Sequence, residues 1–313
     1  MASFLLSPGW RDMGSDTMKR IPEVFAKTLL GRYYDRTLLS SVTNTDIQGE
    51  IQQYGQLVHV RQRPTVTLRR WQRGQTLVND MPESGVSTFQ IDKAWYWSFV
   101  TDDLDDKQVD LKNYVGEWAE EASKEFAKNQ DVEVLAGMPT QVASYNAGVA
   151  AGYRSADINL GAAGNARGLD STNIVDFIVD AGMVLDESNV PDENRFMVIP
   201  VWMAGLIKKS ELRDASITGD PQSLLRRGLI GQVDRFNLFT SNLLDGDKTT
   251  GTYIPFGVPE ATSFATQLTR SKMLDNPNGF GMLHRGLAVY GWKVMRPEAL
   301  GAAYVNIADS GSI

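Results

Sequence analysis

A long amphipathic stretch beginning near residue 107 constrains the fold of this chain more than any other feature. Its apolar side chains recur at helical spacing, at Leu111, Val115, Trp118, Ala122 and Phe126. Glutamate and lysine side chains occupy the positions on the other side. The spacing predicts one helix over about residues 107–135, which is long for a globular domain. We expect Trp118 to be buried beneath this helix.

Residues 55–100, which precede the predicted helix, read as two β-type stretches joined by a turn-rich tip. The last part of the first stretch is residues 65–68, and the last part of the second stretch is residues 94–99. Glycine and proline residues between the two stretches are turn formers. Because a two-stranded hairpin alone is marginally stable in water, we expect it to lean on its own domain or on a neighbouring subunit.

Residues 57–75, here called the arginine segment, contain several arginines but no acid and no lysine. Its prominent residues are Arg61, Arg63, Arg69, Arg70, Trp71 and Arg73. Arginine with tryptophan is typical of protein interfaces, because guanidinium groups form planar ion pairs and stack on rings. Two other interpretations stay open: a solvated hairpin face and a nucleic-acid contact.

An acidic cluster offers a complementary partner for the arginine segment. It comprises Asp102, Asp103, Asp105 and Asp106, near the start of the predicted helix. In an assembly of identical subunits, the arginine segment of one subunit can reach this cluster on its neighbour. The alternatives are that these aspartates cap and solvate the helix N-terminus, or that they bind calcium, for which they lack the ligand spacing of an EF-hand loop.

The rest of the chain alternates helices with isolated strands, which predicts an α+β fold. Residues 146–168 are rich in glycine and alanine and read as a connection. Helical spacing predicts one helix from residue 174 and another over 261–274. Strands are predicted over 195–200, within 229–244 and over 283–295.

Composition and motifs argue against several classes of function. The chain has no cysteine, which excludes disulfides and thiolate sites, and its formal net charge of −7 makes it a poor sequence-independent nucleic-acid binder. His59 and His284 belong to no motif for a catalytic triad, a zinc site or a nucleotide loop. No apolar run reaches the ~20 residues that span a bilayer. We therefore expect no catalysis, no metal, no cofactor and no membrane insertion.

The order of these parts resembles the Hong Kong 97 fold of tailed-bacteriophage major capsid proteins. Local likeness comes from the sequences TFQID at 88–92, RFMVIP at 195–200 and RPEA at 296–299. The resemblance implies an N-terminal arm at 1–54, an extended E-loop at 55–100, a peripheral domain at 101–145 and 278–297 with a spine helix at about 107–135, and an axial domain at 146–277 and 298–313.

The same resemblance implies a structural protein that self-assembles as pentamers and hexamers into an icosahedral shell. The shell would enclose phage double-stranded DNA without sequence-specific contacts, in a virion assembled in the host cytoplasm. Implied partners are a portal protein, a decoration protein and, because only residues 1–54 precede the E-loop, a separate scaffolding protein. An encapsulin-type compartment shell is the alternative, followed by an unrelated soluble α+β enzyme.

A lysine on the E-loop forms an isopeptide bond with a neighbouring subunit in the type member of that family. From Gln52 to Asp92 this chain has no lysine, and the first one after that is Lys93. Arginine cannot replace lysine, because its guanidinium group stays protonated. The sequence therefore predicts a shell that is stabilised without covalent cross-links.

Overall fold

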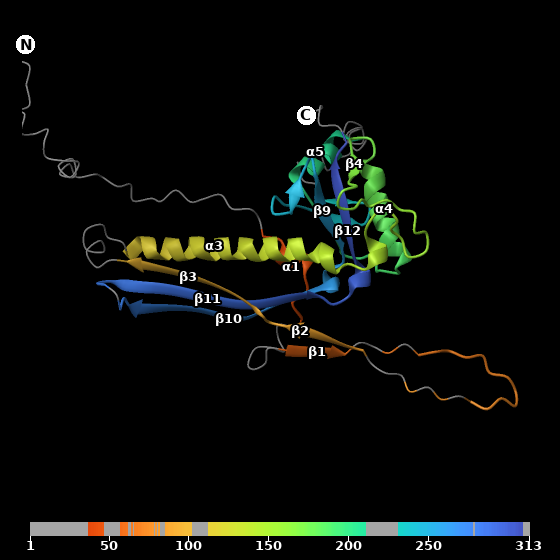
Figure 1. The fold of residues 1–313 in the computed structure, drawn as a ribbon, viewed down its shortest axis with the longest axis horizontal. Helices are drawn as coiled ribbons and strands as arrows, with labels where there is room; N and C mark the ends of the chain where they lie inside the picture. Colours follow the sequence, from red (N-terminus) through yellow and green to blue (C-terminus); the bar gives the residue numbers. More distant parts are fainter. Residues whose placement is uncertain are drawn as a thin grey trace, which may run out of the picture. The chain divides into compact units, whose positions relative to one another are not determined.

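A computed structural model describes residues 37–46, 57–61, 64, 66–77, 79, 81, 85–101, 112–210, 231–277 and 279–308, all of which lie in one compact unit spanning residues 34–313. Helices and strands are mixed along the chain, as predicted (Figure 1). The strands form a seven-stranded sheet, a three-stranded sheet and a two-stranded hairpin.

The seven-stranded sheet has the order β4-β12-β9-β5-β7-β6, with β8 paired to β9. Its strands are β4 (Arg167–Leu169), β5 (Arg195–Ile199), β6 (Gln232–Val233), β7 (Phe236–Thr240), β8 (Gly246–Asp247), β9 (Gly251–Gly257) and β12 (Leu300–Ile307). Every side chain of β5 is buried, which explains why its sequence is a nearly continuous apolar run. The strand predicted at 195–200 is therefore confirmed.

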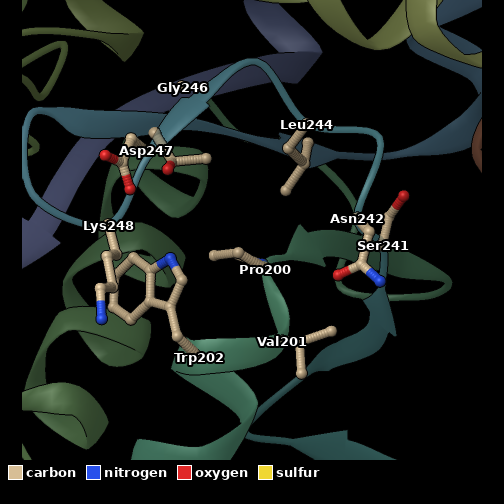
Figure 2. Close-up of a pocket in the computed structure, with 10 residues that line it drawn as sticks. Pro200, Val201, Trp202, Ser241, Asn242, Leu244, Gly246, Asp247 and Lys248 are labelled. Atoms are coloured by element: carbon tan, nitrogen blue, oxygen red, sulfur yellow. The ribbon is translucent and has the colours of Figure 1, made fainter.

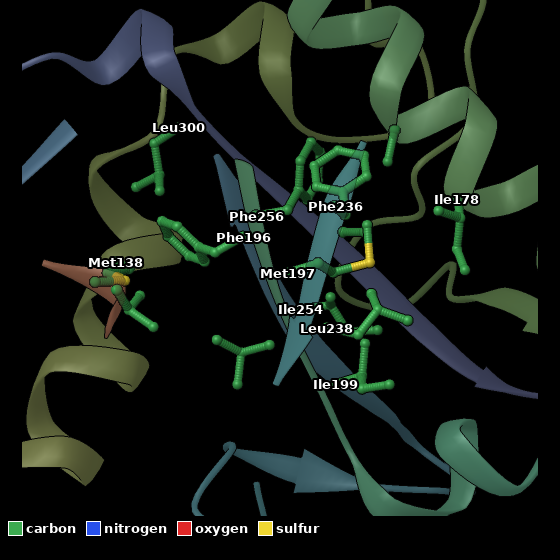
Figure 3. Close-up of a cluster of buried hydrophobic side chains, with 14 of the residues drawn as sticks. Met138, Ile178, Phe196, Met197, Ile199, Phe236, Leu238, Ile254, Phe256 and Leu300 are labelled. Atoms are coloured by element: carbon green, nitrogen blue, oxygen red, sulfur yellow. The ribbon is translucent and has the colours of Figure 1, made fainter. Parts of the chain in front are cut away.

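The main hydrophobic core surrounds this sheet. Two helices flank it, α4 (Ile174–Glu187) and α5 (Val201–Lys209). From α4, Ile178 packs into the same buried cluster as Met197 of β5 (Figure 3). In that cluster the rings of Phe236 and Phe256 meet edge to face, with centroids 6.0 Å apart. Most of this core comes from the second half of the chain, and Leu38, Leu135 and Met138 join it from the first half.

The three-stranded antiparallel sheet lies beside the long helix α3 (Figure 1). Its strands, in the order β10-β11-β3, are β3 (Lys93–Thr101), β10 (Thr262–Asp275) and β11 (Met282–Val294). Helix α3 spans Lys112–Gly137, so the predicted long helix is confirmed, with its end displaced by two residues. The ring of Phe126 on α3 meets that of Tyr290 on β11 at 6.1 Å.

A short hairpin, β1 (Leu57–Arg61) with β2 (Val86–Gln90), leans on the three-stranded sheet. Phe89 and Ile91 are buried against Ala265 of β10. The ammonium group of Lys293 on β11 donates a hydrogen bond to the carbonyl oxygen of Thr88 at 2.7 Å. The expected support for the hairpin thus comes from its own chain.

A short helix near the start of the described chain, α1 (Leu39–Val42), is fastened to α3 by a buried carboxylate. The backbone N–H of Leu38 donates to Oδ2 of Asp131 at 2.6 Å. Burial raises the pKa of Asp131, although the amide hydrogen bonds from Leu38 and Leu39 act in the opposite direction. Four 3-10 turns complete the described elements: η4 (Met138–Gln141), η5 (Ser144–Asn146), η6 (Pro259–Ala261) and η7 (Pro297–Ala299).

Three local expectations were wrong. Residues 262–275 form strand β10, not a helix. Trp118 is 38% exposed, because it contacts Phe99 only edge-on, with centroids 5.7 Å apart. Residues 66–68 form no strand, and all three side chains are exposed.

Candidate functional site

The described residues contain no arrangement that resembles a catalytic or metal centre. His284 is buried, its ring stacks on Phe99 at a centroid distance of 5.0 Å, and its Nε2 lies 3.3 Å from the hydroxyl of Thr101. His59 lies on β1, where its Nδ1 is 3.3 Å from the hydroxyl of Thr88. Across the described ranges, no group of three or more histidine and acidic side chains could hold a metal ion. Both histidines thus serve packing and strand pairing.

Among the helices that the structure describes, none is long and apolar enough to cross a membrane. The longest, α3, carries charged side chains along much of its length, including the ion pair between Glu120 and Lys124 at 2.8 Å.

The hollow next to α5 is a possible ligand site, with a volume of about 250 Å³. Trp202, Asp247 and Lys248 line it, together with Asn242 and the N-terminal residues of α5 (Figure 2). Its only charged lining groups are the carboxylate of Asp247 and the ammonium of Lys248, and both side chains are exposed to solvent. This hollow therefore carries no functional assignment.

The arginine segment is exposed at each described position from Arg61 onwards, whereas Val58 and Val60 on β1 are partly buried. Arg61 ends β1, and the chain from 66 to 77 runs without strand pairing and with every side chain exposed. Gly74, with φ at +89°, lies in a turn closed by a hydrogen bond from Gln75 N–H to Gln72 O at 3.1 Å. Glycine suits this turn, because other residues rarely adopt a positive φ.

The exposed stretch combines arginines with large apolar side chains. Trp71 is 67% exposed and Leu68 is 94% exposed, and Arg69, Arg70 and Arg73 lie between or beside them. The other exposed apolar side chains nearby are Val66, Leu77 and Met81. Apolar groups gathered on an exposed segment are characteristic of a surface that another molecule covers.

The predicted partners of the arginine segment are not brought to it by the described structure. Arg63 and the aspartates Asp102, Asp103, Asp105 and Asp106 lie outside the described residues. The pairing of the arginine segment with this cluster on a neighbouring subunit therefore stays a prediction.

A second charged surface, on the three-stranded sheet, was missed by the sequence reasoning. On the face turned away from α3, the strand register forms three rows: Leu274–Leu283–Val100, Lys272–Arg285–Ser98 and Arg270–Leu287–Tyr96. We call these nine positions the basic sheet face. Its three cationic side chains are exposed, and a groove of about 470 Å³ runs among them.

The basic sheet face places like charges opposite each other. Lys272 and Arg285 are direct cross-strand partners, and Arg270 lies two residues from Lys272 on the same face. None of the three forms an ion pair with another residue in the described part of the chain. Like charges directly opposite on a sheet are destabilising. The strand signal available in the sequence was the spacing of every second residue, at Leu268, Arg270, Lys272 and Leu274.

Another charge cluster among the described residues centres on a buried arginine with partly exposed acidic partners. The guanidinium of Arg195 is fully buried and pairs with Asp186 at 2.8 Å and Asp192 at 3.0 Å. It also donates to the carbonyl oxygens of Val190 at 2.6 Å and Pro191 at 2.9 Å. These contacts fix the chain between α4 and β5, so the cluster is structural.

Several solved structures resemble this chain over nearly its whole length. A chain from Mycobacterium phage Che8 has a TM-score of 0.70 at 22% identity, covering 90% of this chain and 96% of that one. The capsid structure of the cyanophage P-SCSP1u has a TM-score of 0.66 at 13% identity, covering 92% and 93%. The mature capsid of bacteriophage PhiM1 has a TM-score of 0.64 at 16% identity, covering 92% of each chain.

These likenesses define the class of fold: the chain has the α+β fold of phage capsid chains. The fold class predicted from the sequence is confirmed at this level. No family model matches the sequence, and no curated protein matches it. The boundaries of the arm, E-loop, peripheral domain and axial domain stay predictions.

Proposed function

We propose that this chain is the major capsid protein of a tailed bacteriophage. The observation that carries the proposal is the fold, which matches phage capsid chains over at least 90% of this chain. The match spans 92% or more of those chains as well, so the likeness is not confined to one shared motif.

The exposed surfaces support a role in assembly. A segment such as 66–77, with exposed tryptophan and leucine beside arginines, gains from being covered by a neighbouring molecule. We propose that these neighbours are identical copies arranged as pentamers and hexamers in a closed icosahedral shell. The predicted axial segment 146–277 would face the rotation axes of these capsomers.

The proposal includes the contents and partners of the shell. It would enclose double-stranded DNA without sequence-specific contacts and be assembled in the host cytoplasm with a scaffolding protein, a portal and a decoration protein. Because acidic residues outnumber basic ones in the chain, we expect its contacts with DNA to be few and dispersed.

Electron microscopy of the purified protein, alone and with its scaffolding protein, tests this function. We expect closed shells or five- and six-fold rings. A compact monomer under all assembly conditions would contradict the proposal. Native particles that hold protein cargo instead of DNA would favour the encapsulin alternative.

A further inference from the structure

The basic sheet face is an exposed surface that forms no ion pair with the described part of its own chain. Its middle row, Lys272–Arg285–Ser98, places two cations side by side, and Arg270 of the next row adds a third. No acidic residue occupies any of the nine positions. An anionic group that binds here relieves the repulsion between the cations.

Apolar side chains on both sides of the cations narrow the choice of partner. Leu274 is 45% exposed and Val100 50% in one flanking row, and Tyr96 is 79% exposed in the other. The groove among these rows is lined by Leu274, Leu287 and Tyr96 as well as by the cations. A phosphate backbone offers nothing apolar to such a groove, whereas a protein segment with carboxylates around an apolar side chain matches both features.

The sequence that follows β3 has that composition. Residues 101–110, TDDLDDKQVD, place Leu104 between two pairs of aspartates. The segment directly follows β3 in the sequence, and β3 ends at Thr101. Residues 102–110 lie outside the described structure, so their sequence alone enters the argument.

We propose that the basic sheet face of one subunit is the docking site for residues 101–110 of a second copy of this chain. The aspartates pair with Lys272, Arg285 and Arg270, and Leu104 enters the apolar groove. The contact is heterologous, so it repeats from subunit to subunit around a ring or across a shell. The inference rests on the proposed function, because it assigns a contact between subunits of the proposed shell. In this contact the acidic cluster pairs with the basic sheet face instead of with the arginine segment.

Paired charge reversals test the contact. The sheet variant carries Lys272→Glu with Arg285→Glu, and the segment variant carries Asp103→Lys with Asp105→Lys. We expect each variant alone to need a protein concentration about tenfold or more above wild type for assembly, because like charges then face each other across the contact. Light scattering and sedimentation measure that concentration, and thermal melts verify that each variant is folded.

An equal mixture of the two variants distinguishes a contact between chains from one within a chain. In the mixture, every sheet face meets a segment of opposite charge on the other variant, so we expect assembly to return towards wild type. A single chain with all four substitutions should also assemble. The control variant, Lys209→Glu with Lys248→Glu, changes the net charge as the sheet variant does but at exposed sites elsewhere, and it should assemble like wild type.

Direct binding provides an independent readout. A fluorescent peptide of residues 101–110 should bind the full-length wild-type chain, and its Kd should rise about tenfold or more with the sheet variant. The same peptide with asparagine at every aspartate serves as the charge control and should not bind. This measurement decides the inference even if the wild-type chain forms no shells, an outcome that would contradict only the proposed function.

Three results would overturn the inference while leaving the capsid function intact. The first is normal assembly of both charge-reversal variants. The second is restored assembly by the four-substitution chain but not by the mixture, which would place the contact within one chain. The third is that the wild-type chain binds duplex DNA but not the peptide, and that the sheet variant no longer binds the DNA. Phosphate would then be the partner.

Discussion

Arg195 is the residue whose side chain most clearly joins two elements of the larger sheet region. Replacing it with methionine keeps most of its volume but removes the donors to Val190 O and Pro191 O and the pairs with Asp186 and Asp192. We expect Arg195→Met to lower the free energy of unfolding by about 2–4 kcal/mol, because the carbonyl oxygens of Val190 and Pro191 lose a charged donor. The partly exposed Asp186 and Asp192 keep their pairs with Arg235. Urea unfolding followed by circular dichroism measures this change.

Arg296 provides the matched control for that substitution. Its pair with Glu260 at 3.0 Å is exposed, and Arg296→Met should cost about 0–1 kcal/mol. Equal losses for the two variants would show that Arg195 contributes no more than a surface charge.

The Arg195 cluster also makes a prediction about pH. Burial alone would raise the pKa of Asp186, but hydrogen bonds from Arg235 and Arg195 outweigh it and hold that pKa below its ordinary value. The unfolded chain then binds the proton more tightly, so this stabilisation is present above about pH 4 and is lost as the pH falls through the lowered folded pKa. The stability difference between wild type and Asp186→Asn should shrink over that range.

The partial burial of Trp118 lowers the loss of folding stability that we expect when its side chain is removed. The predicted apolar stripe places it on the buried side of α3, yet the residue is 38% exposed and its ring meets that of Phe99 edge-on. We expect Trp118→Ala to cost about 1–2 kcal/mol, the sum of one aromatic contact and partial burial. The fully buried Phe256 is the comparison, and Phe256→Ala should cost about 3–5 kcal/mol. Similar denaturant midpoints for the Trp118→Ala and Phe256→Ala variants would show that Trp118 is buried in solution.

At the scale of elements, the hairpin β1–β2 depends on close approach to β11. A Cβ atom on Gly291 would lie 2.3 Å from the carbonyl oxygen of Gln90, which is backbone and cannot rotate away. Gly291→Ala should therefore displace the end of β2, cost about 1–3 kcal/mol and speed proteolysis within residues 57–90.

Gly205 on α5 is the matched control, because a Cβ atom there meets nothing within 4 Å. Gly205→Ala should leave proteolysis unchanged and stabilise the helix by up to about 1 kcal/mol. Faster cleavage in both variants would indicate a general loss of stability, not a displaced hairpin.

The arginine segment makes a separate prediction about assembly. Shells of an Arg69→Ala, Arg70→Ala double variant should form poorly, because these guanidinium groups are predicted to pair with acids of a neighbour. Added salt should weaken wild-type assembly if the pairs are exposed, since charges are screened over ~8–10 Å at ordinary ionic strength. Wild-type assembly by the double variant would instead favour the solvated-hairpin interpretation.

At the scale of the whole molecule, the predicted absence of covalent cross-links gains a structural argument. Lys93, the first lysine after the arginine segment, forms an ion pair with Glu133, and its ammonium lies 5.2 Å from the ring centroid of Trp292. An amine that already contacts a carboxylate and a ring of its own chain is poorly placed to attack a neighbouring subunit. Mature particles boiled in detergent should run as one band near 34.6 kDa. A ladder of covalent pentamers and hexamers would refute the prediction.

Local patterns alone were sufficient for the long helix α3, the buried strand β5 and the long strand β11. In α3 the apolar side chains keep helical spacing, and in β5 a short continuous apolar run bounded by Pro200 indicates a strand that is buried on both faces. The exposed arginine segment was also evident from composition, and the order of the parts indicated the α+β capsid fold.

Only the tertiary structure decided the nature of residues 262–275. A bulge between Thr266 and Leu268 interrupts the alternation of β10. Phe264 packs against Tyr290 while its neighbour Ala265 packs beneath the hairpin, so both faces are apolar before the bulge. The resulting spacing of apolar residues imitates a helix, and the pairing with β11 overrides it. The basic sheet face exists only because of that pairing, since register between distant strands is what brings Lys272 opposite Arg285.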